Sequence, residues 1–228
     1  MKTVLTTAIL LITLTGANAS HPVSHIAEYP ALGAIRIDAS YGASKRDAPF
    51  FYGHTKELRQ ESVALRASLK RPMGKSYCLT LFAGHADMGG RGTVNPGAGM
   101  RFQVSGDLGG DLVITPHWIW SLGVSASEYR FAEFRGESID MGLINLSLDI
   151  SVSAAREFGP LRVKSGLASY YLRDYFKENR TGSESNRSTS GISPYAAVFF
   201  RPGETVFFGV EYFIGLLRGV SLSSGVAF

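Results

Sequence analysis

The sequence predicts an all-β chain that closes into an antiparallel barrel of about ten strands. Apolar and polar residues alternate with period two in stretch after stretch, as they do in strands whose successive side chains point to opposite faces. Short turns alternate along the chain with longer connections rich in glycine, serine or charge, so neighbouring strands are expected to run in opposite directions. Because the strand number depends on how these connections are divided, about eight or about twelve strands are the alternatives.

The alternation continues to the last residue. Val220, Leu222, Val226 and Phe228 are apolar, whereas the residues on the opposite face are small or polar. This stretch resembles the C-terminal strand of bacterial outer-membrane β-barrel proteins, as a general class rather than one family. The resemblance implies a closed transmembrane barrel in contact with outer-membrane lipid. It also implies recognition by the barrel assembly machinery through the strand that ends at Phe228.

The first residues have the order of a cleavable signal peptide. Lys2 precedes an apolar run from Val4 to Leu14, and Ala17-Asn18-Ala19 is a small-x-small cleavage site. The run is too short to span a bilayer as a helix. We therefore predict a signal peptide at 1–19, an irregular periplasmic lead at 20–31 and the barrel at 32–228, with the exported chain placed in the bacterial outer membrane.

Composition and charge agree with a monomeric barrel that is apolar outside and polar inside. Charged residues are only 18% of the chain, below the roughly 25% of ordinary soluble domains. The net charge of +4 is small and evenly spread, so no nucleic-acid partner is predicted. The single cysteine, Cys78, excludes an internal disulfide, and its parity with Thr80 and Phe82 places it on the inner face.

The alternation predicts where the strands lie. They are expected at 35–41, 63–70, 77–83, 100–114, 118–126, 144–152, 161–171, 195–199, 206–214 and 220–228. The fourth is the longest, because one parity stays apolar from Met100 to Ile114, which suits a tilted membrane strand. Trp118 and Trp120 open the fifth on its outer face, where aromatic rings favour a membrane interface.

The connections predict which end of the barrel is outside. Outer-membrane barrels have long extracellular loops and short periplasmic turns. The long connections are expected at 43–56, 88–97, 130–137 and 177–190, and the short ones at 71–75, 115–117, 156–160 and 201–204. The stretch 177–190 has almost no apolar residue and is expected to be a long, mobile, surface-exposed loop. The last outer connection, near 217–219, is short.

The inner face carries charges of both signs. They are Arg36, Asp38, Arg66, Lys70, Arg101, Asp107, Asp111, Arg162, Lys164 and Glu211. Unpaired buried charges are costly, so we expect these side chains to pair across the lumen. A narrow selective pore is the alternative, because the interior of a small barrel is nearly filled by side chains.

Candidate catalytic residues are few. His54, His85, Asp87, Ser127 and Glu128 are expected near the outer rim, where a His-Asp-Ser set would act on lipid or peptide. The His-x-Ser pair of the deacylase-type barrels is absent from every expected strand, and His117 is expected in a turn without such partners. His21 and His25 have no neighbouring acid or cysteine cluster for a metal. No catalytic, cofactor-binding or metal-binding residue is therefore predicted.

The function predicted from the sequence is that of a non-enzymatic outer-membrane barrel. It would have a structural or surface-exposed role such as adhesion. The alternatives are a narrow solute channel, a lipid- or peptide-modifying enzyme that uses His85 or His54, and a soluble exported binder similar to a lipocalin.

Overall fold

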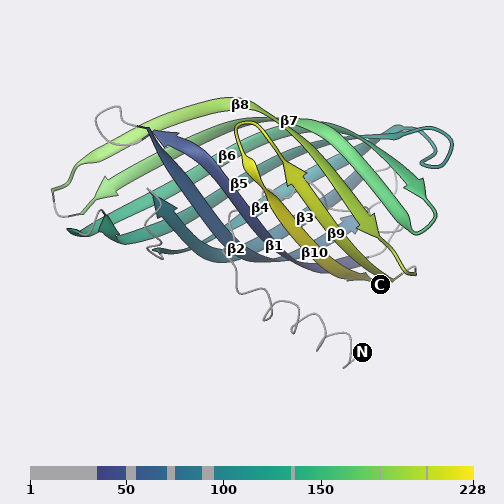
Figure 1. The fold of residues 1–228 in the computed structure, drawn as a ribbon, viewed down its shortest axis with the longest axis horizontal. Helices are drawn as coiled ribbons and strands as arrows, with labels where there is room; N and C mark the ends of the chain where they lie inside the picture. Colours follow the sequence, from purple (N-terminus) through teal and green to yellow (C-terminus); the bar gives the residue numbers. More distant parts are fainter. Residues whose placement is uncertain are drawn as a thin grey trace, which may run out of the picture.

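The structure is a computed structural model that describes residues 35–49, 55–70, 75–88, 95–134, 137–179, 181–203 and 205–228. These residues form ten antiparallel strands that close into a barrel (Figure 1), which confirms the predicted fold class and strand number. In this described part of the chain, no helix is long and apolar enough to cross a membrane. The predicted signal peptide, the periplasmic lead and His54 lie outside the described residues.

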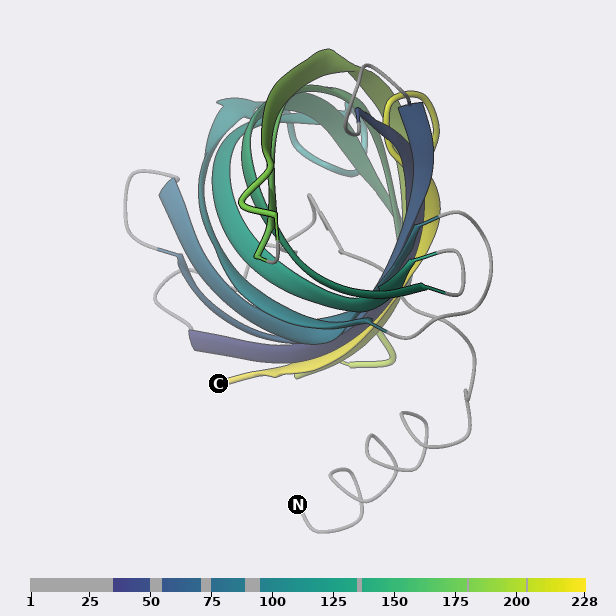
Figure 2. The same ribbon diagram turned by 90° about the vertical axis from the view of Figure 1, so that its left-hand side faces the viewer.

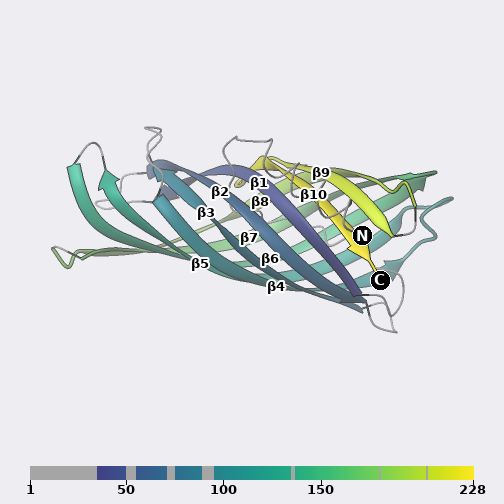
Figure 3. The ribbon, with the colours of Figure 1, turned by 90° about the horizontal axis from the view of Figure 1, so that it is seen from below.

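Each strand pairs with its neighbours in the sequence, and β1 pairs with β10. The strands are β1 (Ile35–Pro49), β2 (Thr55–Lys70), β3 (Lys75–Met88), β4 (Asn95–Gly109), β5 (His117–Phe134), β6 (Glu137–Phe158), β7 (Leu161–Glu178), β8 (Glu184–Phe200), β9 (Val206–Phe213) and β10 (Arg218–Ala227). Viewed from one end, they curve into a closed ring (Figure 2), and viewed from below they share a common tilt (Figure 3).

The closing ladder joins the two ends of the described chain. It runs from Arg36 opposite Ala227 to Lys45 opposite Arg218. The N–H of Phe228 donates to the carbonyl of Ile35 at 2.9 Å, so the last aromatic residue lies beside the start of β1. We call this the terminal end of the barrel, and the opposite end the distal end.

The two faces of the wall differ as the alternation predicts. Large apolar side chains point outward and are exposed, with Leu65 at 58%, Ile150 at 56% and Leu81 at 52%. The inner face holds buried serines, charged side chains and aromatic rings, Cys78 among them. This inside-out distribution is the pattern of a barrel surrounded by lipid, because apolar surface on that scale is unfavourable in water.

The strands are longer than predicted at the distal end. The expected long connection 43–56 is mostly strand, since β1 continues to Pro49 and β2 begins at Thr55. The expected loop 177–190 is wrong: only 179–183 separates β7 from β8, and 184–190 pairs with 171–177. In 184–190 the period-two signal is absent because residues of both parities are polar, while the backbone ladder with β7 continues unchanged.

β4 differs from the prediction at both of its ends. It begins at Asn95 and ends at Gly109, not at Ile114. The register shifts between Asp107 and Gly109, and the φ angles of Gly109, Gly110 and Leu112 are positive, which ends the strand. The apolar parity that continues to Ile114 therefore belongs to a turn.

Glycines make room for the aromatic rings inside the barrel. Tyr195 and Phe199 of β8 and Phe207 of β9 point inward and are buried. Phe199 lies over Gly209 on β9, and Phe207 lies over Gly225 on β10, where an added Cβ would come 2.4 Å from the ring. Large side chains of one strand thus occupy the space that the next strand leaves free.

Candidate functional site

A two-pronged ion pair lies on the inner face of the wall, near the middle of the barrel. Arg101 of β4 donates from Nη1 and Nη2 to the carboxylate of Asp149 on β6, at 2.6 and 2.8 Å. Both side chains are buried. β5 lies between them and carries Gly123, where a Cβ would come 2.1 Å from Arg101 Nη2. The glycine therefore allows a planar guanidinium–carboxylate fork to join two strands that are not neighbours.

A second group of charges lies on β1 and β2. Asp38 accepts from Arg36 Nη2 at 3.0 Å, and its other oxygen is 2.8 Å from Arg66 Nε. The Arg36 guanidinium also lies 3.8 Å from the centroid of the Phe207 ring, a cation–π contact. Arg36, Asp38 and Arg66 thus do pair, but within β1 and with the neighbouring β2, and not across the lumen as predicted.

A third pair lies nearer the distal end and was not predicted. Arg46 of β1 donates to both oxygens of Asp174 on β7, at 2.7 and 2.6 Å. Asn145 of β6 donates to the same carboxylate at 2.7 Å. The sequence interpretation missed Arg46 because it placed 43–56 in a loop. Extending the parity of Arg36 and Asp38 along β1 would have placed Arg46 on the inner face.

Apolar side chains lie in the lumen beyond this pair. Six strands contribute to this distal cluster, which consists of Ala48, Leu58, Ala86, Met88, Tyr129, Phe131, Met141, Leu143 and Phe176. Every member is buried. Ala48, Leu143 and Phe176 lie two residues from Arg46, Asn145 and Asp174, respectively. Because every second residue of a strand points inward, the cluster is the next layer of inward side chains toward the distal end. The distal end of the lumen therefore holds a buried apolar cluster.

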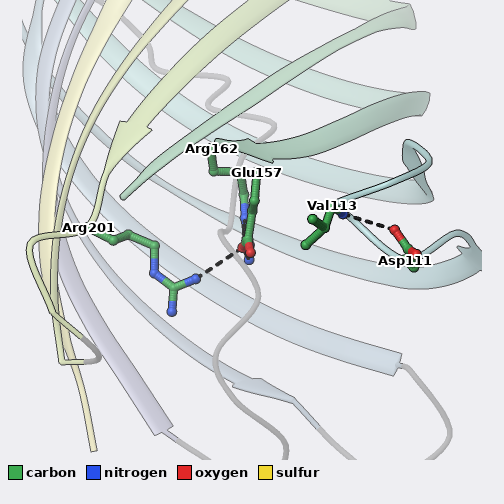
Figure 4. Close-up of polar contacts among 5 residues, drawn as sticks. All are labelled: Asp111, Val113, Glu157, Arg162 and Arg201. Carbon is green, nitrogen blue, oxygen red and sulfur yellow. Dashed lines mark hydrogen bonds and ion pairs between the residues drawn. The ribbon is translucent and has the colours of Figure 1, made fainter. Parts of the chain in front are cut away.

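Ion pairs also tie the turns of the terminal end together. Glu157, at the end of β6, accepts from Arg162 Nε at 2.9 Å and from Arg201 Nη1 at 3.4 Å (Figure 4). Asp107 accepts from Lys70 at 3.3 Å and lies 3.0 Å from His117 Nε2. The prediction that His117 lies in a turn without such a partner is wrong, because it opens β5 beside Asp107.

Asp111 is not an inner-face charge as predicted. It is exposed in the turn between β4 and β5, where its Oδ1 accepts the N–H groups of Val113, Ile114 and Thr115 at 3.0, 2.6 and 3.1 Å (Figure 4). The backbone N–H groups of Thr115 and Ile114 lower the pKa of this carboxyl below its ordinary value of 3.8. Asp111 is thus the cap of a turn.

The candidate catalytic residues do not come together. His85 points outward, and its Nε2 lies 2.9 Å from Glu61 Oε2 on the neighbouring strand. Ser127 points into the lumen and is buried, whereas Glu128 points outward. The barrel wall separates Ser127 from His85, so these two residues cannot share a substrate. In the described ranges, no three His, Cys, Asp or Glu side chains lie close enough to hold a metal.

The comparisons with known proteins agree on the architecture. No protein-family model and no curated protein matches the chain. The translocator domain of the autotransporter NalP from Neisseria meningitidis is similar, with a TM-score of 0.60 at 10% identity over 98% of this chain and 96% of that chain.

Two further solved structures have lower TM-scores. The outer membrane protease OmpT from Escherichia coli has a TM-score of 0.48 at 9% identity over 86% of this chain and 96% of that one. Ail, the attachment invasion locus protein of Yersinia pestis, has a TM-score of 0.43 at 13% identity over 86% and 99%. The likeness to the NalP translocator domain establishes the fold: the chain is a closed antiparallel barrel of the kind found in bacterial outer membranes.

Proposed function

We propose that the chain is a non-enzymatic outer-membrane barrel with a closed lumen, whose distal wall interacts with or adheres to other molecules at the cell surface. The distal cluster carries this proposal, since it lies in the lumen where a channel would have to open. The apolar belt on the outer face supports the membrane location.

The outer face divides into an apolar belt and a charged distal wall. Beyond the belt, the outward side chains are exposed and charged, and they include Lys45, Asp47, Arg59, Glu128, Arg130, Asp140, Arg173, Lys177 and Arg218. Charged side chains on the lipid face are costly at the bilayer midplane, by about 2–4 kcal/mol for Arg or Lys. The distal wall therefore suits the aqueous side, and it raises strand edges and charges above the lipid.

The interior argues against the two main alternatives. A solute would have to break the Arg101–Asp149 and Arg46–Asp174 pairs and then displace the distal cluster. An enzyme that paired His85 with Ser127 would need both on one face of the wall, and they lie on opposite faces. Surface interaction requires neither change.

The closed lumen is tested by electrical recording of the refolded full-length protein in a planar bilayer. We expect no conductance steps above background, after gel migration of unboiled and boiled samples has shown that the barrel is folded. Steps that persist in a folded preparation would overturn the closed lumen and establish the narrow channel in its place.

The surface role is tested by displaying the protein on bacteria that do not otherwise adhere. We expect retention on host-cell layers or abiotic surfaces, and a loss of retention when Lys45, Arg59, Arg130 and Arg173 are changed to Gln together. A matched control changes belt residues Leu81 and Ile150 to Val. Equal retention of displaying and non-displaying cells would contradict the adhesive role.

A further inference from the structure

One strand edge of the distal wall has no partner strand among the described residues. β9 has 8 residues and β10 has 10, whereas β8 has 17. β9 pairs with β8 only along Tyr195–Phe200, and the turn at 214–217 then ends the hairpin. β8 continues past this turn toward the distal end (Figure 1). Among the described strands, residues 184–191 pair only with β7.

The backbone direction of this edge follows from its hydrogen bonds. The N–H of Ile214 donates to the carbonyl of Pro194, and the N–H of Leu216 donates to that of Ile192. The backbone N–H and C=O groups of the even-numbered residues of β8 therefore point away from β7. This holds along the whole strand because the β7–β8 register has no shift. Glu184, Asn186, Ser188 and Ser190 thus direct their N–H and C=O groups to the open edge, which is about 26 Å long at about 3.3 Å per residue.

β1 approaches from the other side without forming a ladder with β8. Its pairing with β10 ends at Lys45 opposite Arg218. β1 and β8 come within 8 Å of each other between Cα atoms, and beyond the end of the ladder Arg46 of β1 reaches Asp174 of β7. Native edges are often protected by proline or a bulge, and Pro49 lies on the β1 edge. Residues 184–191 have neither feature.

The charges beside this edge favour an acidic partner. Glu184 is engaged by Lys177 at 3.5 Å, and Asp47 lies 3.8 Å from Arg218. The exposed Arg187 has no carboxylate among the described residues within ion-pair distance, and Arg173 donates to the Asn186 amide oxygen. Glu184 and Asp47 are thus matched by bases, whereas the positive charge of Arg187 lies on the edge itself.

We propose that residues 184–190 of β8 bind an extended acidic peptide segment as an added antiparallel strand. The backbone groups of Glu184, Asn186, Ser188 and Ser190 would supply the ladder, and Arg187 would face the acidic side chains of the incoming strand. The proposal rests on the proposed function in one respect, namely that the distal end faces the outside of the cell.

The test uses a fluorescent ten-residue peptide that alternates Thr and Asp, titrated against the full-length protein in detergent micelles. We expect saturable binding by anisotropy. Ser188→Pro removes one edge N–H and leaves the β7 ladder intact, and should weaken binding about tenfold. Ser188→Ala keeps that N–H and should bind as the wild type does. Arg187→Glu should weaken binding and reduce its dependence on salt.

Amide hydrogen exchange supplies a readout that needs no variant. In the free protein, the amides of Asn186, Ser188 and Ser190 should exchange quickly and those of Arg187 and Thr189 slowly. The peptide should protect the first three. Absence of binding, equal binding by folded Ser188→Pro, or edge amides already protected in the free protein would each overturn the proposal.

Two outcomes distinguish peptide binding from self-association and from the proposed surface role. Protection of the edge amides that rises with protein concentration alone would show that a second copy occupies the edge, which also overturns the peptide proposal. Displaying cells that adhere while the peptide does not bind would leave the surface role standing and remove only the strand-addition mechanism.

Discussion

The middle and the distal end of the lumen are closed in different ways. In the middle, the buried Arg101–Asp149 pair joins β4 to β6 across Gly123, two strands that are not neighbours. At the distal end, nine apolar side chains from six strands pack together without any charge. Both regions are buried. The middle combines matched charges with an apolar cluster that includes Tyr170, Phe199 and Phe207, whereas the distal cluster contains no charge.

This difference teaches what each region contributes. A buried ion pair adds little net stability, since the attraction between the charges is largely offset by the loss of their hydration. Its two forked hydrogen bonds do fix which strands face each other. An apolar cluster gains stability with the area that it buries and keeps water out. The middle of the lumen therefore specifies the arrangement, and the distal cluster seals it.

The largest effect is expected from removing one charge of a central pair. Asp149→Ala leaves Arg101 buried without its carboxylate, which should destabilise the barrel by about 3–5 kcal/mol. Urea-induced unfolding in lipid vesicles measures the change. The matched control is the double variant Arg101→Met with Asp149→Leu, which should lie close to the wild type. A mild effect of Asp149→Ala alone would mean that water enters the middle of the lumen.

The next effect concerns the distal cluster. Phe176→Ala removes a fully buried ring and should cost about 3 kcal/mol, because the cavity left behind cannot fully collapse. The Arg46–Asp174 pair remains one layer inward, so the planar-bilayer recording should still show no steps. Conductance in Phe176→Ala would show that the cluster alone seals the barrel. Phe176→Leu, which keeps most of the volume, is the control.

The sequence predicts the structure correctly where one face of a strand contacts lipid and must be apolar while the other faces the lumen and is polar. In the belt, Leu65 must face lipid while Arg66 faces the lumen, so the alternation of the two faces is visible in the residues themselves. The ten strands, the inward Cys78 and the inward position of Arg36, Asp38 and Arg66 follow from it.

Beyond the belt that constraint disappears, and the predictions fail there. Residues 184–190 are polar on both faces, and Tyr129 and Phe131 point inward beside the outward charges Glu128 and Arg130. In sequence, both stretches have the composition of a loop. The distal cluster, the Arg46–Asp174 pair and the open β8 edge were therefore missed, because each requires strands that continue past the lipid.

A smaller effect tests the room that the central pair needs. Gly123→Ala places a methyl group against Arg101 Nη2 and Asp149 Oδ2, which forces the fork to shift. Such overpacking should cost about 1–2 kcal/mol. Gly142→Ala on β6 is the matched control, because an added Cβ there meets no atom within 4 Å. If both variants unfold at the same urea concentration, the fork does not depend on a glycine in β5.

The smallest effect is expected outside the lumen, in the turn that Asp111 caps. The folded-state pKa of this carboxyl is lowered by the N–H groups of Thr115 and Ile114, so its contribution to stability is present above the ordinary value of 3.8 and is lost as the pH falls through the folded-state value. Asp111→Asn keeps an acceptor oxygen without the charge. The variant should therefore lose less of its thermal stability than the wild type between pH 5 and acidic conditions near the carboxyl pKa range of about 2–4. Because the turn is exposed, the difference should be smaller than that of Gly123→Ala. An NMR titration that finds Asp111 at its ordinary pKa would show that the turn does not hold the carboxylate.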